Sequence, residues 1–475
     1  SHKLNLKLVN SPYLKDLDQE KYRIYLRSVK KQIEIFREEN IPLFTSMEEK
    51  QQEYGAISAK MSIEVDGKKM TVQKATLLLK STDRAEREEI YNKISSRRLE
   101  DEKVLDDLFD ELISLRQQIA KNADFDNYRD YMFASLGRFD YTPKDCFNFH
   151  DAIAKEIVPI INSFEQKRKN KLGNESYKPW DTAVNVDGLP ALKPFDGGTE
   201  LTDLSIECFN MLRPYFGECL STMKAMKHLD LESKNGKAPG GFMYPLYEIG
   251  VPFIYMNAVG SQRDLVTMVH EGGHAVHSFL SRDLSLTEFK STPSEVAELA
   301  SMAMELLSMD HWDVFYDDAA DLKRAKLEQL EKALETLPWV ASIDKFQHWI
   351  YTNEHTAQQR KKKWLTISAE LGNQIIDWEG NENVHANLWQ KQLHLYEVPF
   401  YYIEYGMAQL GAIAMWRSYK QLGEQGLDNY MDALKMGYTK TIGEIYETAG
   451  IKFDFSASYV KELADFIKVE LEKLS

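Results

Sequence analysis

Two histidines and a glutamate near the middle of the chain have the spacing of a metal site with its own base. Residues 269–277 contain the pattern His-Glu-x-x-His. Residues four apart share one face of an α-helix, so His270 and His274 could bind a single metal ion. Glu271 lies about 100° round the helix from His270 and could reach a water molecule on that ion. The pattern predicts two imidazole ligands and a carboxylate base, and it needs a third ligand from elsewhere.

The third ligand that the sequence favours is Glu298. The residues from Thr292 to Glu295 read as a capping box with proline at the first helical position, which gives Glu295 a structural role. Glu298 and Glu305, seven apart, share a face of the helix that follows, among small and apolar residues. A carboxylate in such surroundings needs a cation or donors. We therefore expect Glu298 to bind the metal and Glu305 to pair with a ligand or another cation; the alternative is that both face solvent.

The same stretch carries another histidine and two glycines. His277 shares the face of His270 but lies about 10 Å along the axis, too far for both to bind one Zn²⁺. We expect His277 to contact a ligand or to pack in the interior, and we keep it as a candidate substrate contact. Gly272 and Gly273 cost a helix about 2 kcal/mol against alanine. They predict close backbone approach by a substrate or a neighbouring strand.

Three protein ligands leave one coordination position for water, which is typical of a catalytic zinc site rather than a structural one. Glu271 would accept the proton of that water and pass it to a leaving amine. The oxyanion needs donors, and His394, Tyr401 and Tyr405 are candidates. The two tyrosines are predicted one turn apart on a helix that starts at Pro399. Ordinary packing of these aromatic rings is the alternative.

Two short β-prone runs, 242–245 and 251–257, precede the predicted metal helix and follow the glycine-rich run 237–241. Proline confines such strands to a sheet edge. An edge strand beside a metal helix suits peptide binding by strand addition, whereas a small structural hairpin is the alternative. The candidate substrate contacts here are Gly240, Gly241 and Phe242.

Most of the remaining chain has helical periodicity. An alternating run at 61–71 around Asp66 and Gly67 predicts a β-hairpin. A long connector is expected at 170–199, and a charged, solvated outer helix at 317–341. The other helices are expected at 15–38, 100–122, 143–169 and 200–228.

Composition limits the class of protein. The chain has 475 residues, 43% of them hydrophobic and 28% charged, which describes a globular protein long enough for two lobes. A net charge of −15 argues against nucleic acid as a partner. No apolar run reaches the roughly 18 residues of a membrane span. The three dispersed cysteines favour a reducing compartment, so we expect a cytoplasmic protein. The start, Ser-His-Lys-Leu, suggests that part of the natural N-terminus is missing.

Taken together, these motifs resemble the thimet oligopeptidase and oligoendopeptidase F group of zinc metallopeptidases, and the oligoendopeptidase F branch is the closer match. The likeness rests on the run 237–241, on 270–274 with Glu298, and on the cluster 394–405. The hairpin at 62–67 and the run 346–349 are also similar to that branch.

The resemblance implies a mainly α fold: a two-lobed helical ellipsoid with a deep central channel and a small β-sheet beside the active-site helix. It implies an N-terminal helical segment with a hairpin at 1–80 and a metallopeptidase region at 81–475. The zinc site would lie within 260–310 and a substrate wall near 390–410.

The function implied is that of a zinc-dependent endo-oligopeptidase with one Zn²⁺ per chain, which cuts internal bonds of short, unstructured peptides. By matching positions, His270, His274 and Glu298 carry over as ligands and Glu271 as the general base. His394, Tyr401 and Tyr405 carry over as contacts to the substrate. The alternatives are a carboxypeptidase-type exopeptidase and a peptide-binding homologue without turnover. The oligomeric state is left open.

Overall fold

The computed structural model describes residues 2–234, 237 and 240–474. Two residues of the glycine-rich run, Ala238 and Pro239, lie outside the described part. The described chain is mainly helical, with one two-stranded and one three-stranded sheet, so the expected fold class is confirmed. Among the described residues, no helix is both long and apolar enough to cross a membrane.

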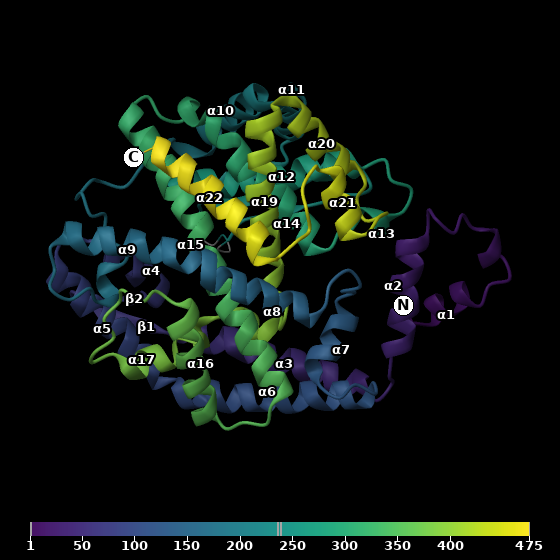
Figure 1. Ribbon diagram of the computed structural model, residues 1–475, viewed down its shortest axis with the longest axis horizontal. Helices are drawn as coiled ribbons and strands as arrows, with labels where there is room; N and C mark the ends of the chain where they lie inside the picture. Colours follow the sequence, from purple (N-terminus) through teal and green to yellow (C-terminus); the bar gives the residue numbers. More distant parts are fainter. Residues whose placement is uncertain (1, 235–236, 238–239, 475) are drawn as a thin grey trace. The chain divides into compact units, whose positions relative to one another are not determined.

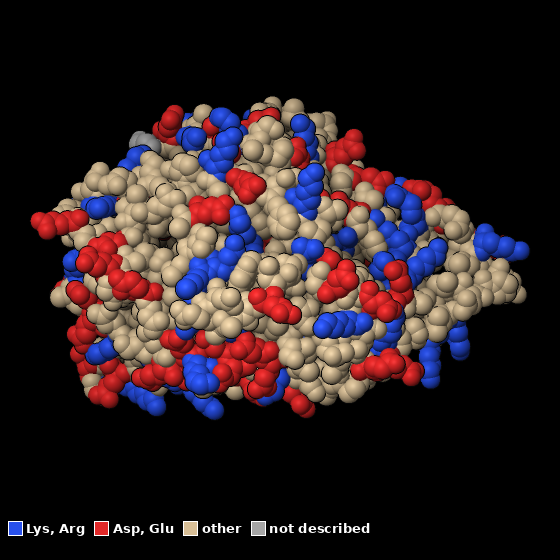
Figure 2. Space-filling view, turned by 60° about the horizontal axis from the view of Figure 1, so that its bottom comes forward, with Lys and Arg blue, Asp and Glu red and all other residues tan. Residues whose placement is uncertain are grey.

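The chain divides into two compact units, each assembled from separate segments. The first unit comprises Ser1–Asn10, Val29–Pro190 and Leu337–Ile403. The second comprises Ser11–Ser28, Ala191–Thr336 and Glu404–Ser475. Figure 2 shows acidic and basic side chains interspersed over the face in view, which offers mixed charge rather than a continuous basic surface.

The first unit is a helical assembly with one hairpin. In the hairpin, β1 (Ser62–Val65) pairs antiparallel with β2 (Lys68–Thr71), and Ser62 lies opposite Thr71. Asp66 and Gly67 have φ angles of 50° and 70°, as a two-residue turn with positive φ at both positions requires. The predicted hairpin is therefore confirmed. The main helices are α3 (Asn40–Lys60), α5 (Arg84–Glu100), α6 (Glu102–Asn122), α8 (Pro143–Ala152), α9 (Val158–Leu172) and α16 (Ala357–Leu371).

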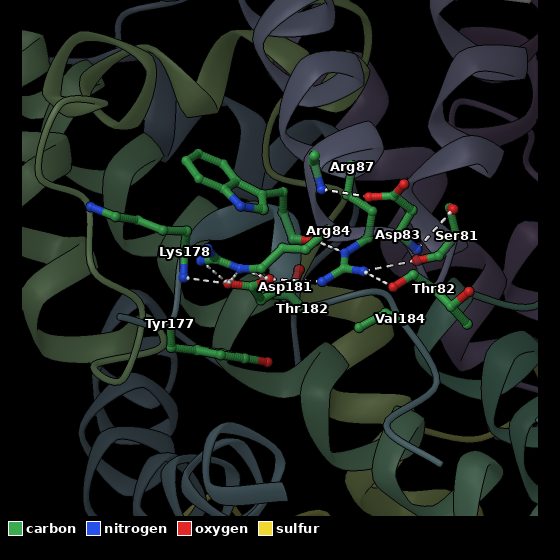
Figure 3. A network of polar contacts seen from close by, with 12 residues as sticks. Ser81, Thr82, Asp83, Arg84, Arg87, Tyr177, Lys178, Asp181, Thr182 and Val184 are labelled. Atoms are coloured by element: carbon green, nitrogen blue, oxygen red, sulfur yellow. Dashed lines mark hydrogen bonds and ion pairs between the residues drawn. The ribbon is translucent and has the colours of Figure 1, made fainter. Parts of the chain in front are cut away.

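A buried ion-pair network ties α5 to the connector that the sequence predicted at 170–199. Asp181 accepts hydrogen bonds from Arg84 Nε at 3.0 Å and from Arg87 Nη2 at 2.9 Å (Figure 3). Arg87 also donates to the carbonyl oxygen of Trp180 at 2.9 Å. The side chains of Arg87 and Asp181 are almost fully buried, so each charge depends on the other.

The second unit contains a three-stranded sheet in the order β3–β5–β4. Strand β3 (Leu229–Glu232) runs parallel to β5 (Phe253–Ala258), and β4 (Phe242–Tyr244) runs antiparallel to it. The expectation of an edge strand holds for β4. It is wrong for β5, which is central. Pro252 precedes the first residue of β5, so its missing N–H removes nothing from the ladder.

The helices α10 (Gly197–Leu212) and α12 (Gln262–Ser281) pack on this sheet, and the second unit contains other helices as well. These others are α11 (Pro214–Ala225), α14 (Ser294–Leu307), α19 (Ile403–Leu422), α20 (Glu424–Lys435), α21 (Ile442–Thr448) and α22 (Ala457–Lys473).

Three helix predictions need correction. The helix expected at 200–228 is two helices, α10 and α11, because Arg213 before Pro214 is extended. Within 15–38, α2 begins only at Arg23 and ends at Ile35, after a single 3₁₀ turn at Leu14–Asp16. The helix expected at 317–341 is the start of α15 (Ala319–Thr352), which continues through Pro338. It is not a solvated outer helix, because Leu330 and Leu334 are fully buried. The charged residues between them cover only its other faces.

Candidate active site

The helix α12 carries most of the site, and its first turn is closed by a capping box. Ser261 Oγ accepts a hydrogen bond from the Asp264 N–H at 3.3 Å, and Asp264 Oδ2 accepts one from the Ser261 N–H at 2.9 Å. The apolar residues Leu265, Met268 and Val269 are fully buried and seat the helix in the unit. The helix extends from Gln262 to Ser281.

A second helix, α14, packs against α12, and the two lie side by side (Figure 1). The contact is close because Gly273 has no side chain. A Cβ there would lie 2.7 Å from the Ala300 carbonyl oxygen and 2.7 Å from Ser301 Cα. A Cβ on Gly272 would lie 2.7 Å from Cζ of Phe209 on α10. The close approach predicted from the glycines is thus made by neighbouring helices, and not by a substrate or a strand.

The start of α14 differs from the expected capping box. The helix begins at Ser294, and its N-cap is Pro293, which makes no side-chain capping hydrogen bond. Glu295 is buried, and its carbonyl oxygen accepts a hydrogen bond from the Tyr446 hydroxyl at 2.9 Å. The prediction placed the N-cap one residue too early, because Pro293 is the N-cap and not the first helical residue.

The packing of α12 on α14 brings the three predicted ligands together. Nε2 of His270 lies 3.4 Å from Glu298 Oε2, and Nε2 of His274 lies 3.8 Å from the same oxygen. One ligand atom from each of the three residues lies within 4.8 Å of the other two. Two imidazoles and a carboxylate are the donor set of a catalytic zinc site, so these residues fit that ion.

Behind the ligands, Glu305 and Gln329 set the orientation of one imidazole. Glu305 Oε1 accepts a hydrogen bond from His270 Nδ1 at 2.7 Å, and its Oε2 accepts one from Gln329 Nε2 at 2.7 Å. A proton on Nδ1 leaves Nε2 of His270 with its lone pair, which is the form that binds a metal. Ser301 Oγ similarly donates to Glu298 Oε2 at 3.1 Å.

The protonation states follow from burial and these contacts. Burial alone would lower the pKa of His270, but its hydrogen bonds to Glu298 and Glu305 raise the pKa well above its usual value, so an ion that binds Nε2 would displace the proton there. Burial and the neighbouring His270 lower the pKa of His274 to about 4. Burial would raise the pKa of Glu298, but His270 and His274 lower it. Glu298 is therefore held as a carboxylate, and His274 as a neutral imidazole.

Glu271 follows His270 and is buried at 7% exposure. Burial, together with the charges of Glu298 and Glu305, raises its pKa above the usual range. The charge of His270 and the backbone N–H of Met243 in β4 act in the opposite direction. A carboxylate with a raised pKa is better matched to proton transfer near neutrality than an ordinary one.

Three candidate substrate contacts of the second unit, Gly240, Gly241 and Phe242, lie at the edge of its sheet. The fourth, His277, lies on α12 in the interior of the unit. Phe242 is 50% exposed and stacks on Tyr255 at 5.0 Å. Asn257 Nδ2 donates to the Gly240 carbonyl oxygen at 3.2 Å, and a Cβ on Gly241 would lie 3.0 Å from Thr267 Cγ2. His277, by contrast, is buried, and burial lowers its pKa to about 3. A buried neutral imidazole supports the packing role.

The aromatic candidates fall in different parts of the chain. His394 and Tyr401 belong to the first unit and Tyr405 to the second. The helix α19 starts at Ile403 and not at Pro399, and Tyr401 lies in a turn after Phe400, whose φ is 68°. The two tyrosines are therefore not one turn apart on a helix. Positive φ at Phe400 cannot continue into an α-helix.

Three residues that contact the site escaped sequence reasoning: Met243, Ser301 and Gln329. Ser301 follows Glu298 by three positions, a spacing that places both on one helix face and could have identified it. Met243 and Gln329 reach the site only through tertiary packing, and no local pattern marks them.

Two long segments of the chain match a known protein family. The model described as peptidase family M3 matches residues 77–200 and 216–465. The chain belongs to peptidase family M3. The resemblance and the prediction of a metallopeptidase are thereby confirmed.

Among relatives of this family M3 chain, an oligoendopeptidase F homologue of Borreliella burgdorferi is 24% identical over 98% of the chain and 78% of its own length. The oligopeptidase PepF of Bacillus subtilis is 24% identical over 64% of the chain and 45% of its own length. The chain thus spans less than half of that second relative.

Solved structures agree on the fold. PZ peptidase A, solved with an inhibitor, has a TM-score of 0.90 and 26% identity, covering 99% of this chain and 84% of that one. An oligoendopeptidase F from Enterococcus faecium has a TM-score of 0.68 and 17% identity, covering 97% of this chain and 79% of that one. The second likeness bears on the fold alone.

Proposed function

We propose that this family M3 chain is a zinc-dependent endo-oligopeptidase that cuts internal bonds of short, unstructured peptides in the cytoplasm. The observation that carries the proposal is the convergence of His270, His274 and Glu298 beside Glu271. Two imidazoles and a carboxylate are a donor set of catalytic zinc sites. Structural zinc sites favour cysteine ligands, which this cluster lacks. The three buried thiols of the chain suit a reducing compartment.

Three residues of the site would bind the ion, and a fourth, Glu271, would transfer a proton. Zinc, when bound by His270, His274 and Glu298, would supply Lewis acidity toward a peptide carbonyl and a water molecule. Glu271 accepts the proton that this water loses and donates it to the nitrogen of the leaving amine. Its raised pKa favours both transfers near neutral pH.

The edge strand β4 offers a place for the peptide backbone. Phe242 and Tyr244 are 50% and 59% exposed, and the backbone N–H of Met243, between them, bonds to Glu271. An extended peptide added to this edge would gain main-chain hydrogen bonds that do not depend on its sequence. Gly240 and Gly241 precede the strand, and His394, Tyr401 and Tyr405 are proposed as further substrate contacts on the strength of the resemblance.

Two alternatives differ in their products. A carboxypeptidase-type enzyme would remove C-terminal residues one at a time, and a silent homologue would bind peptides without cutting them. Glu271, the residue expected to act as the base, is present next to the ligand His270, which favours turnover over silent binding.

The test uses internally quenched peptides of graded length and the full chain loaded with zinc. We expect internal cuts by mass spectrometry, loss of cleavage with a strong chelator, and recovery when zinc returns. Glu271→Gln should lower kcat by about 10²–10⁴-fold while metal content stays unchanged. Glu288→Gln, on an exposed carboxylate of the same unit, is the matched control and should change nothing.

Cleavage that survives the chelator or Glu271→Gln would overturn the mechanism. Products shortened only from the C-terminus would favour the exopeptidase. Peptide binding without any product would favour the silent homologue.

A further inference from the structure

Within the first unit, α8 and the part of α15 from Leu337 onward each present a pair of metal-binding side chains one turn apart. Cys146 and His150 lie on α8, and Asp344 and His348 lie on α15. Residues four apart share one face of a helix, so each pair can direct two donors to the same point. None of these residues belongs to the HExxH site, whose residues all lie in the second unit.

The packing of the two helices brings three of these donors together. One ligand atom each from Cys146, Asp344 and His348 lies within 4.8 Å of the other two. Asp344 Oδ2 lies 3.2 Å from His348 Nε2. Tetrahedral zinc holds sulfur at about 2.3 Å and nitrogen or oxygen at about 2.0 Å, so one sulfur and two such donors lie about 3.3–3.5 Å apart. The three atoms therefore need to close by only about 1 Å.

His150 occupies a supporting position. Its Nε2 makes a hydrogen bond of 2.8 Å with Asp344 Oδ2. A histidine that holds a ligating carboxylate is a common arrangement around metal ions, because it fixes the direction in which the carboxylate points. The other carboxylate oxygen, Oδ1, has no hydrogen-bond partner among the described residues.

The cluster is fully buried and leaves polar atoms unsatisfied. Cys146, His150 and Asp344 have no exposed surface, and His348 is 3% exposed. Nδ1 of His348 has no hydrogen-bond partner within the described part of the chain, and Nε2 contacts only Asp344 there, at 3.2 Å. Buried polar groups in folded proteins are nearly always satisfied, so atoms left over in one cluster point to a missing ligand.

The surroundings favour a cation. Rings of Phe147 and Phe400 pack on His348 with centroids 4.8 and 5.4 Å away, which lowers the local polarity. Asp344 has no exposed surface, and its Oδ2 accepts a hydrogen bond from His150 Nε2 at 2.8 Å, so protein groups and not water must balance its charge. Asp344 is therefore a buried carboxylate. The neighbouring Lys345 forms an ion pair with Glu370, with 2.6 Å between Nζ and Oε1.

We propose that Cys146, Asp344 and His348 form a second zinc site, with His150 as the residue that positions Asp344. A thiolate, an imidazole and a carboxylate suit zinc better than magnesium or calcium, which prefer oxygen donors alone. Binding would release the proton of the Cys146 thiol, and the ion would balance the charges of the thiolate and of Asp344. The site would join α8 to α15 inside the first unit.

Cobalt(II) distinguishes the two sites, because only the second contains sulfur. The full chain is stripped of metal and titrated with Co²⁺ as the probe, and the thiolate-to-cobalt charge-transfer band is followed in the near ultraviolet. We expect two metal equivalents and the band in the wild-type chain. Cys146→Ala should lose the band and one equivalent, whereas His274→Ala should lose the other equivalent and keep the band.

Cys208→Ala is the matched control, since Cys208 is also fully buried but lies in the second unit. It should keep both the band and two equivalents. Zinc content of the wild-type chain, measured by mass spectrometry after reconstitution, needs no variant and guards against misfolding of Cys146→Ala. A single zinc equivalent with no cobalt–thiolate band overturns the proposal, as does a band that persists in Cys146→Ala. Neither result depends on peptidase activity.

Discussion

Glu305 Oε1 lies 2.7 Å from Nδ1 of His270, so a carboxylate two turns beyond Glu298 sets the tautomer of a proposed zinc ligand. The Glu305→Gln substitution keeps the shape of the side chain but removes the negative charge that holds the proton on Nδ1 of His270. Such partners are worth about 10–100-fold in metal affinity. We expect the zinc Kd to rise by that factor and activity to return when zinc is in excess. Competition with a chelating dye measures the Kd, and an unchanged Kd would contradict the positioning role.

The two helix glycines should respond differently to alanine. At Gly273 the clash is with the backbone of α14, which carries Glu298 and cannot move away without moving the ligand. Overpacking costs about 1–3 kcal/mol, more than the roughly 1 kcal/mol that alanine gains in a helix. Gly273→Ala should therefore lower both the free energy of unfolding in urea and the zinc content.

Gly272→Ala meets only the ring of Phe209, so a smaller side chain can relieve it. We expect Phe209→Leu to recover part of the stability lost in Gly272→Ala, with a coupling of about 0.5 kcal/mol or more in a double-mutant cycle. The same Phe209→Leu change should not rescue Gly273→Ala. Equal rescue of both glycine variants would show that the helix contact has been misassigned.

Asp181 should be among the most sensitive polar positions of the first unit (Figure 3). Asp181→Asn leaves the buried Arg87 without its carboxylate partner, and breaking a buried pair from one side costs about 3–5 kcal/mol. Urea unfolding of the variant measures the loss. Asp187→Asn is the control, because Asp187 pairs with Lys171 on the surface and such pairs contribute at most about 1 kcal/mol.

Glu444 should make stability depend on acid pH. Hydrogen bonds from the hydroxyl and the N–H of Thr441, and then the charge of Arg23, lower its pKa to about 2. A depressed pKa means that the stabilisation is complete above the unfolded-state pKa of about 4.3 and is lost as pH falls toward the folded-state value. Because the side chain is partly exposed, we expect a contribution of about 0.5–1 kcal/mol.

The comparison is between the wild-type chain and Glu444→Gln in urea, from roughly pH 7 to pH 3. The stability gap between them should narrow over that range. Glu447→Gln, an exposed carboxylate on the same helix, should show no comparable pH dependence. A gap that stays constant with pH would mean that the charge of Glu444 does not stabilise the fold.

Local spacing in the sequence determined the parts of the site that lie on one helix. The i, i+4 spacing of His270 and His274 and the seven-residue spacing of Glu298 and Glu305 specify which side chains share a face, because helix geometry is the same in every context. Turn chemistry likewise predicted the hairpin at Asp66 and Gly67.

Only the tertiary structure decided which elements meet. The two glycines predicted that something approaches α12 closely. The sequence could not show that α14 is the partner of Gly273, because the two segments share no local pattern. The central place of β5, the contact of Gln329 with Glu305, and the meeting of Cys146 with Asp344 and His348 are of the same kind. Such contacts depend on how whole faces pack together, and spacing within a single helix or strand carries no information about the partner across the interface.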